Sequence, residues 1–181
     1  TLEPIFFNLF SKFGKEKVVS KAPFKKITYK DSMLKYGTDK PDLRNPIEIF
    51  DVTQIIKRPD VKLDIFKKLI EKGCVVRAIP APNTSSKPRN FFDTLNNWAK
   101  EEGGKGLGYI IFEKKDNQLI GKGPIAKFFS PEAVREIAKF CKLNENDSVF
   151  FSCDKLKEVE KISGIARQKL GKELNLISDN K

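Results

Sequence analysis

The residues best suited to chemistry lie in one stretch of eleven, Tyr36–Pro46, which holds two carboxylates, two cations, two prolines and a glycine. Asp39 and Asp42 are candidates for a paired acid and base, or for magnesium ligands. Two carboxylates beside Lys40 and Arg44 can also pair locally and fix the loop. From the residues alone, we favour this local structural role.

The chain lacks histidine, which narrows the chemistry open to it. It has no Ser-His or Cys-His nucleophile pair, no His-ligated zinc and no imidazole proton shuttle. Its three cysteines, Cys74, Cys141 and Cys153, follow no metal-ligand spacing, and each lies beside apolar residues. We therefore predict buried, reduced thiols, so chemistry within this stretch would depend on carboxylates, lysine or a bound metal.

The composition is that of a globular protein with a hydrophobic core. Of 181 residues, 39% are hydrophobic and 33% are charged, which excludes a disordered tail. The sequence shows no apolar run near the roughly 20 residues that span a bilayer and no signal peptide, so we expect a cytoplasmic protein without a membrane partner. Because the sequence opens with Thr1 inside a helix-like pattern, we also expect a piece of a longer protein.

The formal net charge of +11 is unevenly distributed. Residues 1–46 carry 10 Lys and Arg against 5 Asp and Glu, and residues 73–129 carry 9 against 5. The other two segments, 47–72 and 130–181, are close to neutral. An excess of this size fits contact with a phosphate backbone. Lysine-rich surfaces are also common for solubility, and charge alone favours that second interpretation.

Helices and a strand are expected to position the Tyr36–Pro46 stretch. Thr28 with Asp31 three residues later resembles a capping box, which opens a helix. Asp60 after Pro59 is the expected N-cap of a later helix. The elements expected before residue 73 are helices over 5–13, 29–36 and 61–72 and a strand at 47–50.

From residue 73 onward, strands and helices mix in an α+β order. Pro80 should end the first strand, and Ser130 should cap a helix that starts at Pro131. Gly164 inside the last helix costs about 1 kcal/mol relative to alanine, so we expect it to allow close packing against a neighbour. The order predicts a small, mostly antiparallel sheet with helices packed on one face. Its expected elements are strands at 74–79, 107–113, 118–120 and 148–152, and helices over 91–102, 131–141 and 156–174.

The glycine-rich segment Gly103–Gly108 differs from a phosphate-binding loop. Such a loop needs lysine followed by serine or threonine and then a helix whose amides meet the phosphates. Here a helix is expected before the segment and a strand after it. We therefore predict a helix ending followed by a tight turn.

Aromatic and basic side chains offer a further set of nucleic-acid candidates. Phe91, Phe92 and Trp98 are possible base-stacking platforms, but their helical spacing favours a place in the core. Lys122 and Lys127 lie on a basic, glycine-flexed link, where they either contact a phosphate backbone or face water. The residues leave that choice open.

Four separated stretches together resemble the bacterial-type aspartyl-tRNA synthetases. The longest is Tyr-Gly-Thr-Asp-Lys-Pro-Asp-Leu-Arg-Asn-Pro at 36–46, and the others lie at 105–107, 123–128 and 170–174. The resemblance implies a class II ligase that activates aspartate with ATP and Mg²⁺ and charges tRNA(Asp) in translation as a homodimer. It places the catalytic motifs outside this stretch, so no catalytic, cofactor or metal residue is carried over.

The resemblance also implies a domain division. Residues 1–50 would flank the class II catalytic domain, 51–72 would form a linking helix region, and 73–178 would form the insertion domain known as the GAD domain. Two alternatives stay open: an autonomous basic RNA-binding module, and the GAD domain of a tRNA-dependent amidotransferase subunit. The Tyr36–Pro46 stretch is not expected in the amidotransferase. The candidate contacts to the tRNA backbone are Lys40, Arg44, Lys105, Lys122 and Lys127.

Overall fold

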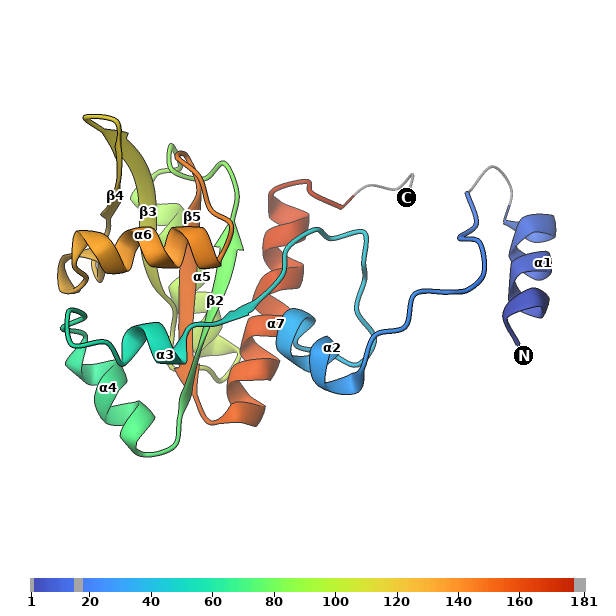
Figure 1. The fold of residues 1–181 in the computed structure, drawn as a ribbon, viewed down its shortest axis with the longest axis horizontal. Coiled ribbons are helices and arrows are strands. Elements are labelled where there is room, and N and C mark those ends of the chain that lie inside the picture. The colour runs from blue at the N-terminus through green and yellow to red at the C-terminus, as the bar shows by residue number, and fades with distance from the viewer. Residues whose placement is uncertain (1, 15–17, 178–181) are drawn as a thin grey trace.

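Five antiparallel strands form one sheet in the order β1-β2-β5-β3-β4 (Figure 1). The computed structural model describes residues 2–14 and 18–177, so the predicted domain end at 178 lies outside the described residues. The elements are α1 (Glu3–Phe13), α2 (Tyr29–Tyr36), β1 (Phe50–Asp51), α3 (Thr53–Ile56), α4 (Asp64–Glu71), β2 (Val75–Ala81), α5 (Arg89–Glu101), β3 (Gly108–Lys115), β4 (Gln118–Lys122), the 3-10 helix η1 (Ala126–Phe128), α6 (Pro131–Phe140), β5 (Ser148–Asp154) and α7 (Leu156–Glu173).

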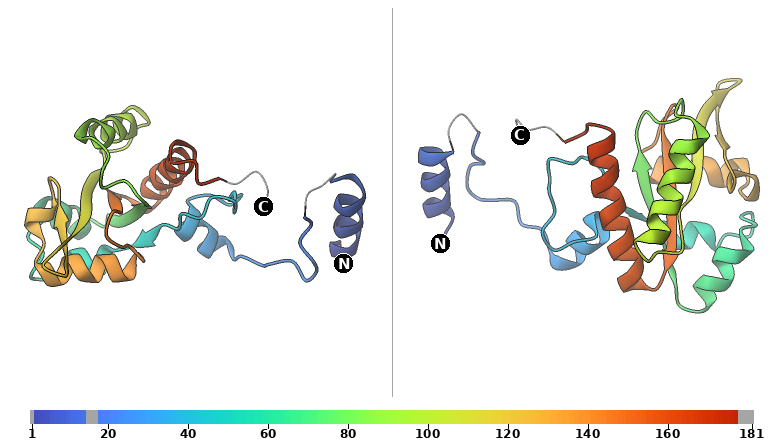
Figure 2. Two further views of the ribbon diagram at one scale, coloured as in Figure 1. Left: turned by 90° about the horizontal axis from the view of Figure 1, so that it is seen from above. Right: turned by 180° about the vertical axis from the view of Figure 1, so that it is seen from behind.

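Helices cover both faces of this sheet, which corrects the prediction of helices on one face. Residues of α3, α4 and α6 share one core cluster, whereas residues of α5 and α7 share the other. Figure 2 shows α5 and α7 on one side of the strands and α6 on the other. The reason is visible in β5, where neighbouring Phe150 and Phe151 point to opposite clusters and both are 0% exposed. The α+β class and the strand–helix order from residue 73 are confirmed.

Strand β2 continues through Pro80, which was predicted to end it. The backbone of Val76 faces the β1 side, because its carbonyl accepts from the Val52 amide at 3.0 Å. The two-residue period of a strand turns Pro80 to the same side. Strand β1 reaches only as far as Ala78, so Pro80 has no strand neighbour there that requires an N–H donor. Pro80 is therefore tolerated, because the edge of β2 that it faces has no paired strand at this position.

The predicted strand at 47–50 is shorter than expected, because only Phe50 of that segment pairs in β1. The preceding residues bond elsewhere. The Ile49 amide donates to the Lys35 carbonyl of α2 at 2.8 Å, and the Ile47 carbonyl accepts from Arg167 of α7. This segment therefore connects α2 and α7 to the sheet instead of extending it.

Residues 51–72 contribute apolar side chains to the core of the sheet domain. Val52 and Ile56 are 0% exposed and belong to the same cluster as the apolar residues of α6. By contrast, the predicted helix α1 leaves its apolar residues exposed and stands apart from the sheet in Figure 1. Within residues 2–14 and 18–177, each helix is too short or too polar to cross a membrane.

Helix starts agree with the prediction at two sites and differ at a third. Thr28 accepts from the Asp31 amide, and Ser130 accepts from the Ala133 amide, each at 3.0 Å. Asp60 does not cap a helix, because α4 begins only at Asp64. Asp60 instead accepts two hydrogen bonds of 2.8 Å from the Arg58 guanidinium and one from the Ser130 hydroxyl. These bonds, led by those from Arg58, hold the pKa of Asp60 far below its usual value.

Replacing Asp60 with asparagine should therefore lower stability at pH 7 and flatten its acid dependence. The folded-state pKa of Asp60 lies below the unfolded one, so its contribution is complete above the unfolded pKa of about 4 and is lost as pH falls below it. Urea midpoints of the Asp60→Asn variant should thus differ from those of the parent more at pH 7 than at pH 2. Asp116→Asn in the exposed β3–β4 turn is the control, and an equal effect from it would contradict this role of Asp60.

Candidate functional site

The Tyr36–Pro46 loop is held on α7 by one buried arginine. Arg167 is 0% exposed, and its guanidinium donates to the carbonyls of Ile47 at 2.6 Å, Asn45 at 2.7 Å and Asp42 at 3.0 Å. The same guanidinium lies 4.8 Å from the ring centroid of Tyr36. Burial lowers the pKa of Arg167, and this effect is opposed by its charged and aromatic neighbours. One cation thus binds both ends of the loop.

Asn45 completes this attachment from the loop side. Its side-chain amide donates to the Arg167 carbonyl at 2.9 Å, and its side-chain oxygen accepts from the Ile47 amide at 3.1 Å. Gly171 makes room, since a Cβ there would lie 2.2 Å from the Asn45 amide nitrogen. The loop therefore packs closely against α7 at Gly171.

The two loop carboxylates pair locally, as predicted. Asp42 accepts from Nε and Nη2 of Arg44 at 3.0 and 2.8 Å and from the Arg44 backbone amide at 3.0 Å. The side-chain bonds from Arg44 hold the pKa of Asp42 below its usual value. Asp39 lies 3.8 Å from the Lys40 ammonium and is exposed. Within the described residues, no three His, Cys, Asp or Glu side chains form a metal-binding group.

The other basic candidates lie on different elements. Lys105, in the turn before β3, is 2.7 Å from Asp154 at the end of β5. Lys122, at the end of β4, is 2.5 Å from Glu113 of β3. Lys127 in η1 lies over the ring of the next residue, 5.1 Å from its centroid. Four of the five predicted contact residues, Lys40 and Arg44 included, therefore have a carboxylate partner, and their contact with tRNA stays a prediction.

The aromatic side chains belong to the core, as predicted. Phe92 is 0% exposed and stacks on Tyr109 with 4.5 Å between ring centroids. Phe91 and Trp98 pack, partly buried, against the same cluster. The glycine-rich segment after α5 leads directly into β3, with left-handed φ values of 90° and 96° at Gly103 and Gly106. It is a turn, as predicted.

The three cysteines are free and buried, as predicted. Burial raises the pKa of Cys141 and of Cys153 to about 12. Thiols with such pKa values carry almost no thiolate near neutral pH. Neither residue is therefore suited to act as a nucleophile.

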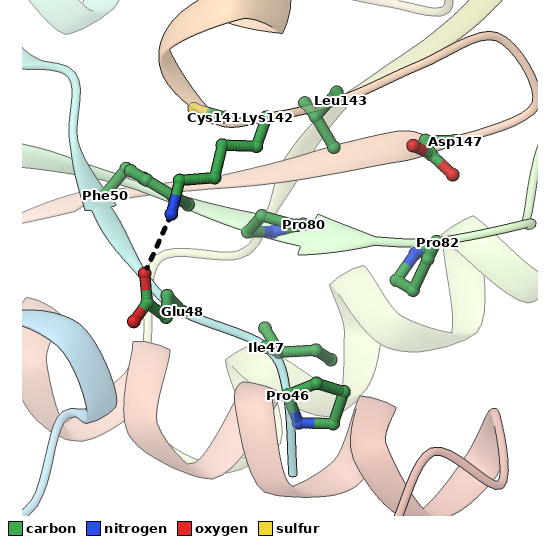
Figure 3. A pocket seen from close by; sticks show the side chains of 10 residues that line it. All are labelled: Pro46, Ile47, Glu48, Phe50, Pro80, Pro82, Cys141, Lys142, Leu143 and Asp147. Carbon is green, nitrogen blue, oxygen red and sulfur yellow. Dashed lines mark hydrogen bonds and ion pairs between the residues drawn. The ribbon is translucent and has the colours of Figure 1, made fainter.

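A cavity of about 390 Å³ opens between the loop, the end of β2 and the turn after α6 (Figure 3). Its walls are largely apolar, with the charged pair Glu48–Lys142 at one end and Asp147 at the other. The lining residues are Pro46, Ile47, Glu48, Phe50, Pro80, Pro82, Cys141, Lys142, Leu143 and Asp147.

Arg167 is the important residue that the sequence prediction missed. It lies next to the predicted apolar stripe of the last helix, and a charged residue there usually faces water. The available signal was its spacing from Ser163 and Gly171, four residues to either side, because small residues on one helix face leave space for a long side chain.

Comparison with known proteins gives one family and several relatives. The family model described as the GAD domain matches residues 66–163. An aspartate–tRNA(Asp/Asn) ligase of Pelagibacter ubique is 48% identical over 99% of this chain, which covers 30% of that relative. Relatives with the same name from Methylocella silvestris and Beijerinckia indica are 49% and 50% identical over 97% of this chain, which covers 28% and 29% of them. The chain thus spans less than a third of the length of these curated relatives.

Proposed function

Because the chain belongs to the GAD domain family, we propose that it is the insertion region of an aspartate–tRNA ligase together with a flanking piece of catalytic domain. The observation that carries this proposal is the 48–50% identity to such ligases over nearly the whole chain. That similarity includes the loop at 36–46, which lies outside the family match at 66–163. The division into 1–50, 51–72 and 73–178 is part of the proposal.

The loop separates the ligase from the amidotransferase alternative. A GAD domain alone fits either class of protein, because the family match begins only at residue 66. The relatives that extend over the loop are named as ligases for tRNA(Asp/Asn). We infer that the whole protein charges both of these tRNAs, in the cytoplasm and as a homodimer.

This chain supplies a structural part of that enzyme and not its chemistry. The parent enzyme would use ATP and Mg²⁺ to activate aspartate, then transfer it to the tRNA. Asp39 and Asp42 are locally engaged, the described cysteines are buried, and the described residues hold no metal-ligand group. We therefore assign ATP, Mg²⁺ and aspartate to parts of the enzyme outside this chain.

A chimera tests the proposal. The corresponding segment of the Pelagibacter ubique ligase is replaced by this chain, and aspartylation of tRNA(Asp) is measured beside the isolated chain. The chimera should charge tRNA within about tenfold of the parental ligase, and the isolated chain should give only background. A folded chimera without activity would contradict the assignment to a ligase, and charging by the isolated chain would contradict its non-catalytic role.

We also propose that the end of the β3–β4 hairpin and the 3-10 helix η1 contact the tRNA backbone. Lys114 and Lys115 at the end of β3 are exposed, as is Lys127. Among the described residues, no carboxylate lies within 4.0 Å of these three ammonium groups. Unpaired cations are free to replace counterions on a phosphate backbone, which makes binding depend on salt.

Salt titration of tRNA binding tests this second proposal. Alanine at Lys114, Lys115 and Lys127 should lower the slope of log K against log salt by about one per lost contact. The control replaces Lys157, Lys161 and Lys172, three exposed lysines of α7, and so makes the same change in net charge. Equal slopes for the two triple variants would contradict a contact through the hairpin end and η1.

A further inference from the structure

The cavity of Figure 3 is a preformed apolar slot. Pro46, Pro80 and Pro82 contribute three rigid walls from two separate segments, and Ile47 and Leu143, both buried, contribute two more. A cavity of about 390 Å³ with mostly apolar walls and few polar groups has the size and character of a small-molecule site. None of the residues proposed above for tRNA contact lines it.

Asp147 brings a buried negative charge to one end of this slot. The residue is 8% exposed, and its two carboxylate oxygens accept from the backbone amides of Asn83 at 2.9 Å and Asn144 at 2.8 Å. Within residues 2–14 and 18–177, no lysine or arginine nitrogen lies within 4.0 Å of this carboxylate. Buried charges are usually paired with an opposite charge, and an ionised carboxylate has about four acceptor positions. The two backbone amides hold the Asp147 carboxylate in place, and its remaining acceptor positions are open to a ligand.

The lysine that lines the cavity is engaged at the opposite end. Lys142 donates to Glu48 at 3.5 Å and lies 5.9 Å from the ring centroid of Phe50. Figure 3 shows this pair across the slot from Asp147, with Pro80 between them. Lys142 is therefore not the partner of Asp147.

This cavity is poorly suited to bind a peptide as an added β-strand. Pro80 of β2 and Pro82 just after it line the opening, and neither has an N–H group with which to form a ladder. Recognition must then come from apolar contact along the slot and from the charge at its end. Both features fit one compact molecule better than an extended chain.

We propose that this cavity binds a small organic cation, an amidinium, guanidinium or primary ammonium carried on a flat apolar body. The cationic group pairs with the Asp147 carboxylate, and the apolar body lies between the prolines and Leu143. A planar two-nitrogen cation fits best, because it places one N–H on each carboxylate oxygen.

Benzamidine tests the proposal, with neutral benzamide as the control of the same shape. In an NMR titration of the chain labelled with ¹⁵N, benzamidine should shift the amides of Asn83 and Asn144 with a dissociation constant on the order of 1 mM. Benzamide should bind at least about tenfold more weakly. Asp147→Asn should weaken benzamidine to the level of benzamide. Equal binding of the two probes, or no shift near the cavity, would overturn the proposal.

A second variant decides the matter if Asp147→Asn fails to fold. Lys142→Glu changes an exposed side chain at the mouth, leaves Glu48 paired only with Lys35, and should tighten benzamidine about threefold through added negative charge. Lys139→Glu makes the same charge change at an exposed residue of α6 that does not line the cavity. It should leave benzamidine binding unchanged. Equal effects of the two variants would show that only net charge matters, and would overturn a site at Asp147.

Discussion

The Arg167→Met variant should unfold with a free energy lower than that of the parent chain by about 3 kcal/mol. Methionine has a similar length but cannot donate, so the carbonyls of Asn45 and Ile47 lose their partner in a buried setting. Each unsatisfied buried carbonyl costs about 1–3 kcal/mol. Part of that cost is offset, because the folded state no longer holds a desolvated guanidinium.

The effect should be local as well as global. Amide exchange across the loop that bonds to Arg167 should rise by at least an order of magnitude, while β2 and β5 keep their protection. Arg167→Lys should fall between parent and Arg167→Met, because an ammonium cannot reach three carbonyls in the guanidinium geometry. Lys161→Met, an exposed change on the same helix, is the control and should stay within about 0.5 kcal/mol. An Arg167→Met variant as stable as this control would contradict the role of Arg167 as the loop anchor.

Helix caps and turns, which depend on residues close together in the sequence, were predicted correctly. Thr28 and Ser130 cap their helices as expected, and Gly103–Gly108 forms the expected turn, with positive φ values of 90° at Gly103 and 96° at Gly106. Each of these features depends on the backbone of a few consecutive residues. The same reasoning therefore predicted the order of strands and helices from residue 73.

Predictions failed where a partner far along the chain decides the outcome. Asp60 follows a proline and precedes an apolar run, as an N-cap does, but its oxygens bond to Arg58, two residues earlier, and to Ser130, which is 70 residues away. Pro80 was expected to end a strand, because the sequence does not reveal that β1 stops before reaching it. The prediction of helices on one face overlooked the consecutive apolar residues of β5, which are typical of a strand buried on both faces.

The candidate loop shows the same limit at the level of the site. Its residue types indicated local pairing of Asp42 with Arg44, which the structure confirms. The sequence contained nothing that linked this loop to Arg167, which lies more than 120 residues further along and makes its strongest contacts through backbone carbonyls. Any residue type supplies the same backbone carbonyl. The residue types of the loop therefore could not predict that its carbonyls bond to Arg167.

The second large effect is expected from Gly164→Ala, which changes the free energy of unfolding in two opposite ways, through helix propensity and through a steric contact. Helix propensity alone predicts that Gly164→Ala stabilises α7 by about 1 kcal/mol. The structure predicts the reverse, because a Cβ at Gly164 would lie 2.6 Å from the carbonyl oxygen and 3.1 Å from the Cα of Gly37. Gly37 has a left-handed φ of 68° where α2 ends, so the backbone that must move is already constrained at a helix end.

We expect the steric term to prevail, with Gly164→Ala lowering the free energy of unfolding by about 2 kcal/mol and Gly164→Val by more. Both sides of the contact are backbone, so rotation of a side chain cannot relieve it, and α2 must shift away from α7. Urea unfolding of both variants measures this, with Gln168→Ala on the exposed face of α7 as the control for helix propensity. A Gly164→Ala variant more stable than the parent would show that propensity outweighs the contact, and that α2 and α7 separate at little cost. The dependence on side-chain size distinguishes the two terms, because valine lowers helix propensity only slightly relative to alanine but adds two methyl groups at the contact.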